Sequence, residues 1–381
     1  MDVQPKPLTG YRVVELGAIG PGPYCGQLLA DLGADVIVVH RPGPDLPSVD
    51  ARGKRSIVVD LRKAGAADIV LDLVETADVL IEGNRPGVAE RLGVGPLACL
   101  ERNPALIYGR MTGWGQTGPW AGMAGHDINY IALTGALLAL GKDGEPPPPP
   151  LNLVGDFGGG SLFLALGIVS ALLRAQKTGT GDIIDASILD GTSSMMGVVH
   201  SLTANGQWTA ARGANLLDGG APFYRCYRTS DHKFMAAGAI EPQFFARMLG
   251  VLGIDPVDFG PQNDPAAWPA QHRILEKVFA SRNRDDWAAL FDGVDACVTP
   301  VLDYLEAPSH PQNRARRSHL RAGDLVHPHE APRFAGSSAD WTPPAVRPRG
   351  ADTAQIVPQA AGGGDYRRET ADREAIAAER E

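Results

Sequence analysis

Residues Tyr11–His40, which read YRVVELGAIGPGPYCGQLLADLGADVIVVH, decide the fold. The segment Tyr11–Leu16 is rich in valine and lies between two glycines, as buried strands do. Pro23–Leu32 has its apolar residues at helical spacing, and Asp35–His40 is again a β-branched run. A strand, a helix and a second strand in so short a stretch predict a βαβ unit with parallel strands.

The alternation continues beyond this unit. Further strands are predicted at Ser56–Leu61, Val79–Glu82, Leu106–Met111 and Asp182–Leu189, with a helix over Ala64–Glu75. The most apolar run, Ser161–Leu173, is shorter than the roughly 20 residues that span a bilayer, so we expect a buried helix there. The pattern therefore predicts an α/β fold with a Rossmann-like, doubly wound parallel sheet.

Changes in composition divide the chain. Prolines 146–150 favour an extended connector, because proline lacks an N–H and fixes φ. A hairpin with a turn at SDH is predicted over Phe223–Gly238, followed by helices at Pro242–Leu252 and Ala266–Ser281. We therefore predict a large Rossmann-like domain over 1–205, completed by about 320–358, a linker and small α+β domain over 206–319, and a flexible tail over 359–381.

Composition excludes several classes of function. Of the 381 residues, 44% are apolar and 21% are charged, which is typical of a globular protein with a sizeable core. The formal net charge is −9 with both signs well mixed, so we expect neither nucleic acid nor a membrane as a partner. The four cysteines form no CxxC pair, and no metal site is predicted. The N-terminal residues have no apolar signal core, so we expect a cytoplasmic protein.

The glycines of the first strand-to-helix turn suggest a dinucleotide-binding site, but the spacing and neighbours of these glycines do not match the dinucleotide-binding motif. From Gly20 the spacing is GxGxxxG rather than GxGxxG, and Pro21 and Pro23 remove two N–H donors that would cradle a pyrophosphate. Where a carboxylate would hold the ribose, the chain has His40 and Arg41. A basic residue at this position suits a phosphorylated ribose better than that of NAD.

Arginines recur near the ends of the predicted strands. Arg41 follows the second strand, Arg55 and Arg62 flank the third, and Arg85 and Arg91 follow the fourth. Open α/β sheets bind ligands at such ends, and arginine suits bidentate contacts with phosphate. Each arginine alone is explained by solvation at the surface, but the group favours a nucleotide phosphate.

Acid–base chemistry is suggested by His126, Asp156 and Glu241. Each begins or precedes an apolar helix, so a role in capping explains each of them alone. If His126 and Asp156 face each other across one carbon, one group can remove a proton and the other can return it to the opposite face. The backbone N–H of Asp127, at a helix N-terminus, can then stabilise the enolate.

These stretches resemble the α-methylacyl-CoA racemases within the class III CoA-transferase (CaiB/BaiF-like) superfamily. The matching motifs are VVELGAIGPGP, LLADLGADVIVV, ADVLIEGNRPGVAERLG, MTGWGQTGP, AGHDINY, LNLVGDFGGG, RGANLLDGGAPFY, GAIEPQFF and VDACVTPVL. They run from about Val13 to Leu302. The resemblance implies an isomerase of fatty acid metabolism that interconverts (R)- and (S)-2-methylacyl-CoA through an enolate. It implies no cofactor beyond the CoA of the acyl-CoA substrate, and an interlocked homodimer.

The resemblance also assigns residues. It implies that His126 and Asp156 are the two acid/base groups and that Glu241 supports His126 from the partner subunit. Asp127 and Tyr130 would lie near the thioester, and Gly125 leaves room for close approach of the ligand. The positions that match the CoA-binding residues are Arg41, Val59, Leu61, Arg62, Arg85 and Arg91, with Gly125, Asp127 and Tyr130 completing the binding set.

Two other functions stay open. A CoA-transferase of the same superfamily would use Asp156 as a nucleophile and form a covalent acyl-enzyme. Such an enzyme has no use for a second base, so His126 favours the racemase. An acyl-CoA-binding protein without turnover would need none of the three acid–base residues. His40 and Asn84 depart from the pattern of the superfamily, which has an acid and an aromatic residue, respectively, at these positions more often.

Overall fold

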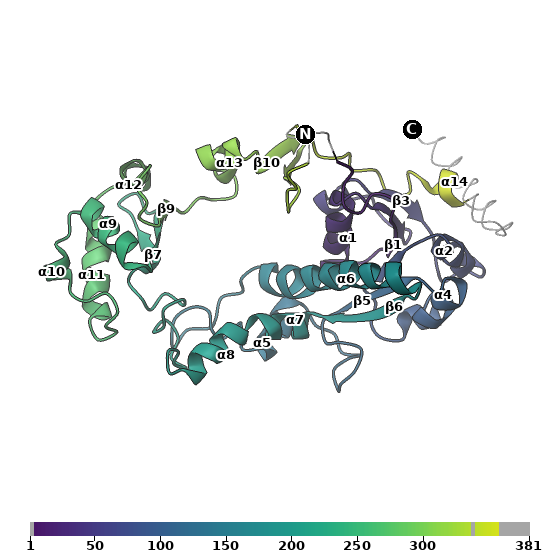
Figure 1. Cartoon of the computed structure of the whole chain (residues 1–381), viewed down its shortest axis with the longest axis horizontal. Coiled ribbons are helices and arrows are strands. Elements are labelled where there is room, and N and C mark those ends of the chain that lie inside the picture. Colours follow the sequence, from purple (N-terminus) through teal and green to yellow (C-terminus); the bar gives the residue numbers. More distant parts are fainter. Residues whose placement is uncertain (1–3, 337–339, 358–381) are drawn as a thin grey trace. The chain divides into compact units, whose positions relative to one another are not determined.

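The computed structural model describes residues 4–336 and 340–357, and they divide into two compact units (Figure 1). Among these residues, unit 1 holds 4–134, 150–195 and the stretch from 314 onward, and unit 2 holds 135–149 and 196–313. The divisions at 195 and 313 lie near the boundaries predicted at 205 and 319. The prediction did not place the connector 135–149 in the smaller unit. The predicted tail, 359–381, lies outside the described residues.

Unit 1 is built on a six-stranded parallel sheet. Its strands are β1 (Arg12–Leu16), β2 (Asp35–His40), β3 (Arg55–Val58), β4 (Val79–Glu82), β5 (Ile107–Thr112) and β6 (Asp182–Ser187). They are ordered β3-β2-β1-β4-β5-β6, and every neighbouring pair is parallel. The order reverses between β1 and β4, which is the crevice where doubly wound sheets bind ligands. The predicted fold class is confirmed.

Helices cover both faces of this sheet. On one face, α2 (Ala66–Val74), α4 (Pro96–Arg102) and α14 (Thr353–Ile356) contribute to one hydrophobic cluster. On the other, α1 (Pro21–Asp31) and α6 (Leu162–Thr178) contribute to a second. The central strands β1, β2 and β4 are buried on both sides, which explains their continuous apolar runs, whereas the edge strand β6 is partly exposed. The remaining elements are a 3₁₀ turn (Val49–Ala51), α3 (Val88–Arg91), α5 (Asp127–Leu133), α7 (Ile188–Met195), α13 (Pro311–Ala315), and the hairpin β10 (His319–Ala322) and β11 (Leu325–Pro328).

The predicted buried helix is only half buried. Helix α6 follows directly on a π-helical segment, η2 (Leu153–Ser161), and Leu153–Thr178 together are long and apolar enough to cross a membrane by length and composition alone. Leu164 and Ile168 lie in the core beneath the sheet. Three leucines on the opposite side, Leu162, Leu166 and Leu173, are exposed. The sequence run predicted the helix but did not reveal this uncovered apolar side.

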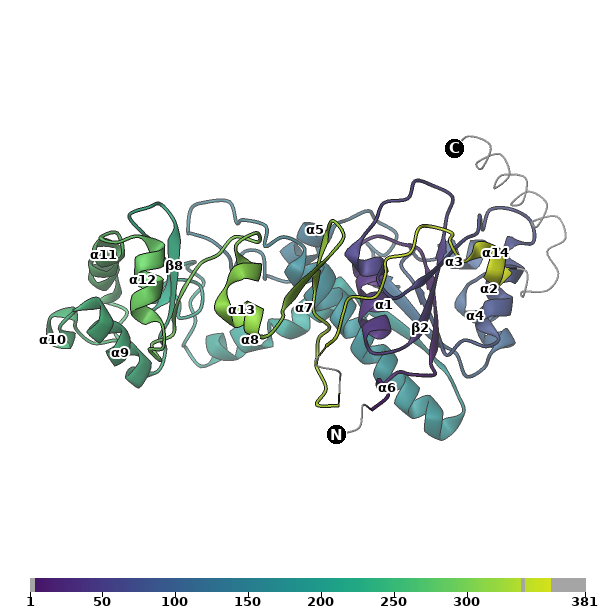
Figure 2. The ribbon, with the colours of Figure 1, turned by 90° about the horizontal axis from the view of Figure 1, so that it is seen from above.

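Unit 2 is a small α+β fold. Strands β7 (Tyr224–Arg228), β8 (Phe234–Gly238) and β9 (Val298–Pro300) form an antiparallel sheet, and the first two are the predicted hairpin. Helices α9 (Pro242–Leu252), α11 (Trp268–Phe279) and α12 (Arg284–Phe291) supply its apolar core. The short elements are α8 (Gly197–Ala204), α10 (Pro256–Phe259) and a 3₁₀ turn (Ala307–Ser309). Figure 2 gives a second view of both units.

Candidate active site

Asp156 lies inside the π-helical segment η2, not at the helix N-cap that the sequence suggested. The following glycines permit this geometry, because η2 is packed too closely against α7 for side chains. A Cβ on Gly159 would lie 2.4 Å from Thr192 Oγ1, and one on Gly191 would lie 1.9 Å from the Gly159 carbonyl oxygen. The Ser161 hydroxyl donates to the Asp156 carbonyl at 3.1 Å and fixes the end of the segment.

The loop after β1 approaches the Asp156 carboxylate. A Cβ on Gly20, which has φ of +78°, would lie 3.1 Å from Asp156 Oδ2. The Asn152 amide donates to the same oxygen at 3.3 Å. The sequence analysis did not identify Asn152, although its spacing of four residues from Asp156 places both on one side of a helical turn. Together, Gly20 and Asn152 leave the carboxylate half-buried and oriented.

His126 occupies the N-cap of α5 and is exposed. Its backbone is extended, and its N–H donates to Asn129 Oδ1 at 3.0 Å. The N–H groups of the first turn of a helix have no carbonyl four residues earlier, and they carry a partial positive charge. The α5 N-terminus therefore places an imidazole beside backbone donors, as the sequence indicated.

Asp127 joins α5 to η2. Its Oδ1 accepts a hydrogen bond from the backbone N–H of Asp156 at 2.6 Å, and its Oδ2 is buried without a partner. Gly155 makes this contact possible, because a Cβ there would lie 2.2 Å from Asp127 Oδ1. One side chain therefore fixes the two segments that carry His126 and Asp156 against each other.

The surroundings of Asp156 raise the pKa of its carboxyl group. Burial raises the pKa of the Asp156 carboxyl, the Asn152 amide lowers it, the Asp127 charge raises it and His126 lowers it; the net shift is upward. Burial likewise raises the pKa of Asp127. A carboxyl group whose pKa is moved toward neutrality is suited to general acid–base catalysis. Asp127, the residue next to His126, bonds the Asp156 N–H, so the segments that carry the two groups are in contact.

Aromatic side chains support the loop that leads to His126. The Tyr130 hydroxyl donates to the Gly125 carbonyl, and its ring contacts Trp114 edge-on at a centroid distance of 4.7 Å. Added Cβ atoms on Gly113 and Gly125 would lie 2.0 Å and 2.6 Å from the Tyr130 ring. Gly125 thus makes room for Tyr130. Its predicted role toward the ligand stays a prediction, and Trp114, whose Nε1 is buried without a partner, was not anticipated.

The predicted CoA-binding residues occupy the carboxyl edge of the sheet. Arg41 and Arg85 are exposed immediately beyond β2 and β4. The pKa of Tyr130 is raised by burial and by the Asp156 charge, and Arg85 partly opposes this rise, so its charge acts near the acid–base centre. Arg91 ends α3 and is exposed. Arg41 and Arg85 follow strands, as the sequence predicted, and the binding of CoA by all three arginines stays a prediction.

Other predicted positions are less available. The Val59 side chain is only 1% exposed and lies in the core, so only its backbone can meet a ligand. Leu61 packs partly against the same core. Arg62 forms an exposed ion pair with Asp60, with Nε to Oδ1 at 2.8 Å.

The expectation that Arg55 lies at the ligand-binding edge is wrong. It begins β3 and bonds Asp35 at the start of β2, with Nε to Oδ1 at 2.8 Å. Since parallel strands share their direction, this ion pair lies at the opposite, amino edge of the sheet.

A buried ion network holds the loop that carries Arg85. Glu82, which ends β4, accepts the Asn84 N–H at 2.7 Å and Arg110 Nε at 3.0 Å. Arg110 also reaches Glu90 at 2.9 Å. The sequence gave no signal for this network, because Arg110 comes from a different strand. It fixes the backbone between β4 and α3 and so positions Arg85.

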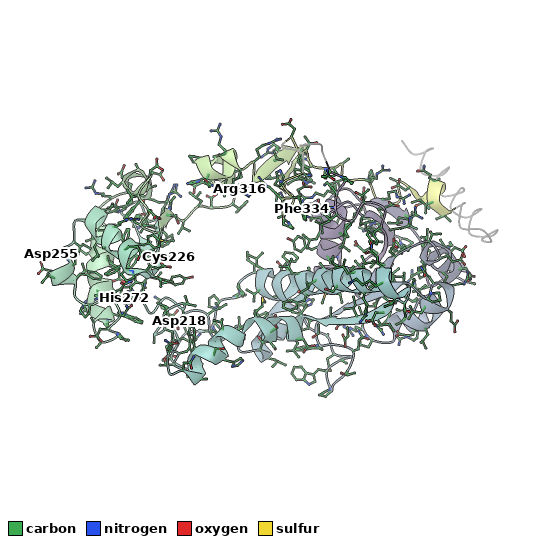
Figure 3. The ribbon with its side chains drawn as sticks, viewed as in Figure 1. Asp218, Cys226, Asp255, His272, Arg316 and Phe334 are labelled. Carbon is green, nitrogen blue, oxygen red and sulfur yellow. The ribbon has the colours of Figure 1, made fainter. Side chains whose placement is uncertain are left out.

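Glu241 belongs to unit 2, where it is exposed at the N-cap of α9. Its proposed support of His126 stays a prediction. The preceding RGANLLDGG motif forms a loop organised by Asp218, which accepts the N–H groups of Asn215 at 2.8 Å and Gly213 at 3.0 Å (Figure 3). His272 contacts the same loop through the Gly220 carbonyl at 2.7 Å.

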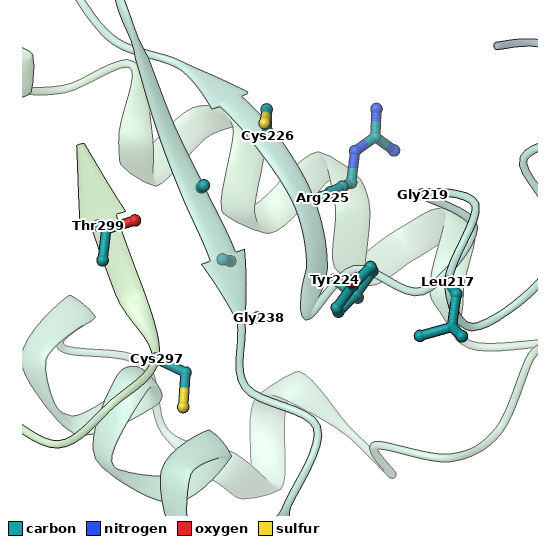
Figure 4. Close-up of a pocket in the computed structure, with 10 residues that line it drawn as sticks. Leu217, Gly219, Tyr224, Arg225, Cys226, Gly238, Cys297 and Thr299 are labelled. Carbon is teal, nitrogen blue, oxygen red and sulfur yellow. The ribbon is translucent and has the colours of Figure 1, made fainter. Parts of the chain in front are cut away.

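A shallow pocket of about 500 Å³ lies on the sheet of unit 2 (Figure 4). Ala236, Gly238 and the exposed cysteines Cys226 and Cys297 are among the residues that line it. The charge of Glu241 raises the pKa of the Cys297 thiol, after burial as the main cause. Among the described residues, no group of three or more His, Cys, Asp or Glu side chains is arranged to hold a metal ion.

The fold and the site define a class of protein. A doubly wound sheet carries exposed arginines after β2 and β4, and an imidazole and a half-buried carboxyl lie near a helix N-terminus. This is the arrangement of an α/β protein built for acid–base chemistry on a phosphate-bearing ligand.

Comparison with known proteins identifies the family. The model of CoA-transferase family III matches residues 8–353, and the chain belongs to this family. The alpha-methylacyl-CoA racemase of Mus musculus is 46% identical over 333 residues, 87% of each chain. That of Homo sapiens is 44% identical over 335 residues, again 87% of each chain. The crystal structure of a CAIB/BAIF family protein from Brucella suis, 28% identical, has a TM-score of 0.78 and covers 94% of this chain and 100% of its own.

Proposed function

We propose that the protein is an isomerase that interconverts (R)- and (S)-2-methylacyl-CoA thioesters by two-base proton transfer. The observation that carries this proposal is the pairing of His126 with Asp156 through the contact between Asp127 and the Asp156 N–H. The two curated relatives named alpha-methylacyl-CoA racemase support the same substrate class. The substrate places the protein in fatty acid metabolism, and no cofactor beyond the CoA of the substrate is required.

The proposed reaction breaks the α-carbon–hydrogen bond of the thioester. One group accepts the proton, while the electron pair moves toward the carbonyl oxygen and forms an enolate. The Asp127 N–H donates to that oxygen at the α5 N-terminus. The conjugate acid of the other group then protonates the opposite face of the carbon. The upward shift in the pKa of Asp156 suits a group that must both accept and donate a proton.

The decisive experiment is proton NMR of each enantiomer of a 2-methylacyl-CoA in D₂O without free carboxylic acid. We expect the wild type to exchange the α-proton and form the other enantiomer. The His126→Gln and Asp156→Asn variants should racemise far more slowly than the wild type. Each should retain α-proton exchange with only one enantiomer, and the two variants should differ in which enantiomer that is. CoA transfer to an added acid without α-proton exchange would instead establish Asp156 as a nucleophile.

The second part of the proposal is a cytoplasmic, interlocked homodimer in which Glu241 of one protomer supports His126 of the other. The exposed leucines of α6, 51% for Leu162, 64% for Leu166 and 58% for Leu173, form an apolar stripe that a second copy would bury. Light scattering should give the mass of a dimer. Leu166→Glu should weaken the dimer, whereas Leu97→Glu, at an exposed leucine of α4, should not. A monomeric wild type would contradict this part.

A further inference from the structure

A second cationic group lies beside the predicted nucleotide end of the site, on a segment remote in sequence. The C-terminal residues 347–356 return to the sheet, where α14 contacts β3 (Figure 1). Asp352 Oδ2 accepts the Ser56 N–H at 2.9 Å, and Thr353 Oγ1 accepts the Val58 N–H at 3.0 Å. These bonds fix the return segment to the edge strand.

Arg349, on this segment, holds the loop that follows β2. Its Nη1 donates to the Arg41 carbonyl at 2.9 Å, and its backbone N–H donates to Asp45 Oδ1 at 3.1 Å. A Cβ on Gly43 would lie 3.7 Å from Nη1, so the guanidinium lies against the loop itself. Arg349 therefore bonds this loop at its first residue, Arg41, and again at Asp45.

Part of this guanidinium is left without a partner. The Arg349 Nε is buried and makes no hydrogen bond. The β2 loop therefore does not use the full hydrogen-bonding capacity of this guanidinium, and an arginine with spare donors is suited to bind an anion beside the loop. His40, beside it, has its pKa lowered to about 4 by burial and then by Arg349 and Lys54, against the opposing charges of Asp45 and Asp50. The imidazole is therefore neutral at pH 7, and the positive charge facing an anion would come from the two arginines.

The topology indicates which anion fits. In a doubly wound sheet the end of β2 is where the ribose of a bound adenine nucleotide lies, and an arginine there accommodates a ribose phosphate. CoA carries such a phosphate on the 3′-oxygen of its adenosine. Resting on the proposed function, we propose that Arg349 positions Arg41 and, with it, binds the 3′-phosphate, so that the return segment selects CoA over 3′-dephospho-CoA.

Calorimetric titration of the full chain with CoA and with 3′-dephospho-CoA tests this proposal. The wild type should bind CoA at least about tenfold more tightly than 3′-dephospho-CoA. A tenfold ratio of Kd values corresponds to about 1.4 kcal/mol of binding free energy. Arg349→Gln should lose most of this preference, with affinity for 3′-dephospho-CoA unchanged within about twofold. Equal weakening of both ligands, or a wild type without preference, would overturn the proposal.

The matched control is Arg347→Gln on the same segment. Arg347 Nη1 bonds Asp352 Oδ1 at 2.5 Å and does not contact the β2 loop, so this variant loosens the segment but should keep the preference for CoA. Arg349→Lys retains charge without the planar fork and should show an intermediate preference, which also covers the case in which Arg349→Gln does not fold. Binding is measured without turnover. A wild type with the expected preference but no α-proton exchange would reject the proposed racemase and leave this inference intact.

Discussion

The two ends of the candidate site are built in opposite ways. Around Asp156 the backbone is packed so closely that glycines are required, and burial raises the pKa values of Asp156 and Asp127. At the nucleotide end, Arg41 and Arg85 lie on exposed loops. Hydrogen bonds to the loop backbone from Arg349 and Glu82, respectively, fix these loops in place.

The difference follows from the task of each end. A group that moves protons needs an environment that shifts its pKa, and such an environment is costly to the folded state. A group that binds phosphate needs a permanent charge, which can stay in water, and a backbone that holds it in place. Substitutions at the acid–base end should therefore change kcat, and those at the nucleotide end should change KM.

Asp156→Asn should have the largest effect, with racemisation reduced by about 10²–10⁴-fold because one of the two proton-transfer groups is lost. Steady-state polarimetry with a 2-methylacyl-CoA measures this loss. KM should change by less than about threefold, since Asn keeps the shape of the side chain. Wild-type turnover would contradict the two-base assignment.

The same variant should be more stable than the wild type at neutral pH. The folded-state pKa of Asp156 is raised above its unfolded value, so its stabilising contribution is present below the unfolded pKa, about 3.9, and is lost as pH rises through the folded pKa. Thermal unfolding of both proteins between pH 3.5 and about 8 should show a gap in Tm that opens with rising pH. A variant less stable than the wild type at pH 7 would mean that the carboxylate stabilises the fold.

Gly155→Ala tests whether close packing matters as much as the chemical groups. Its Cβ would lie 2.2 Å from Asp127 Oδ1, so η2 and α5 must separate. A misplacement of this size predicts a loss of about 10²-fold in kcat, with a destabilisation of about 1–3 kcal/mol. Gly197→Ala on α8, where a Cβ meets nothing within 4 Å, is the control and should leave both unchanged. If Gly155→Ala and Gly197→Ala had the same kcat and the same stability, close packing at Gly155 would not be required.

The sequence predicted the fold well because its signals were local. Valine-rich strands alternating with helices predicted the sheet, and neighbouring motifs located His126 and Asp156. The prediction failed where conformation depends on distant contacts. The π-helical segment around Asp156 exists because Gly159 and Gly191 let η2 pack on α7, and no local pattern shows this.

The supporting residues escaped prediction for the same reason. Arg110 meets Glu82 only across neighbouring strands, and Arg349 meets Arg41 only after the chain has returned from unit 2. Arg55 has the charge of a phosphate-binding residue, but it lies at the amino edge of the sheet and is paired with Asp35. A charge read from sequence therefore says little until the strand direction and the pairing partner are known.

Among the predicted CoA-binding arginines, Arg85→Gln should have a larger effect than Arg62→Gln. Arg85 is exposed and acts electrostatically on Tyr130, whereas Arg62 is already paired with Asp60. We expect KM for a 2-methylacyl-CoA to rise about tenfold in the first variant and less than about threefold in the second, with kcat nearly constant in both. The reverse order would show that the Asp60–Arg62 pair opens to receive the nucleotide.

The smallest effect should be a shift of the pH profile in Asp127→Asn. The Asn carbonyl can still accept the Asp156 N–H, so the packing of α5 on η2 is kept. The negative charge that helps to raise the pKa of Asp156 is removed, and that pKa should fall. The rate that requires ionised Asp156 increases as pH rises through this pKa, so the acidic limb of kcat/KM should move to lower pH. The control is Asp258→Asn, on α10 of unit 2, which should not shift the acidic limb of kcat/KM. If Asp127→Asn does not shift this limb either, the pKa of Asp156 is set by burial and Asn152 and not by the Asp127 charge.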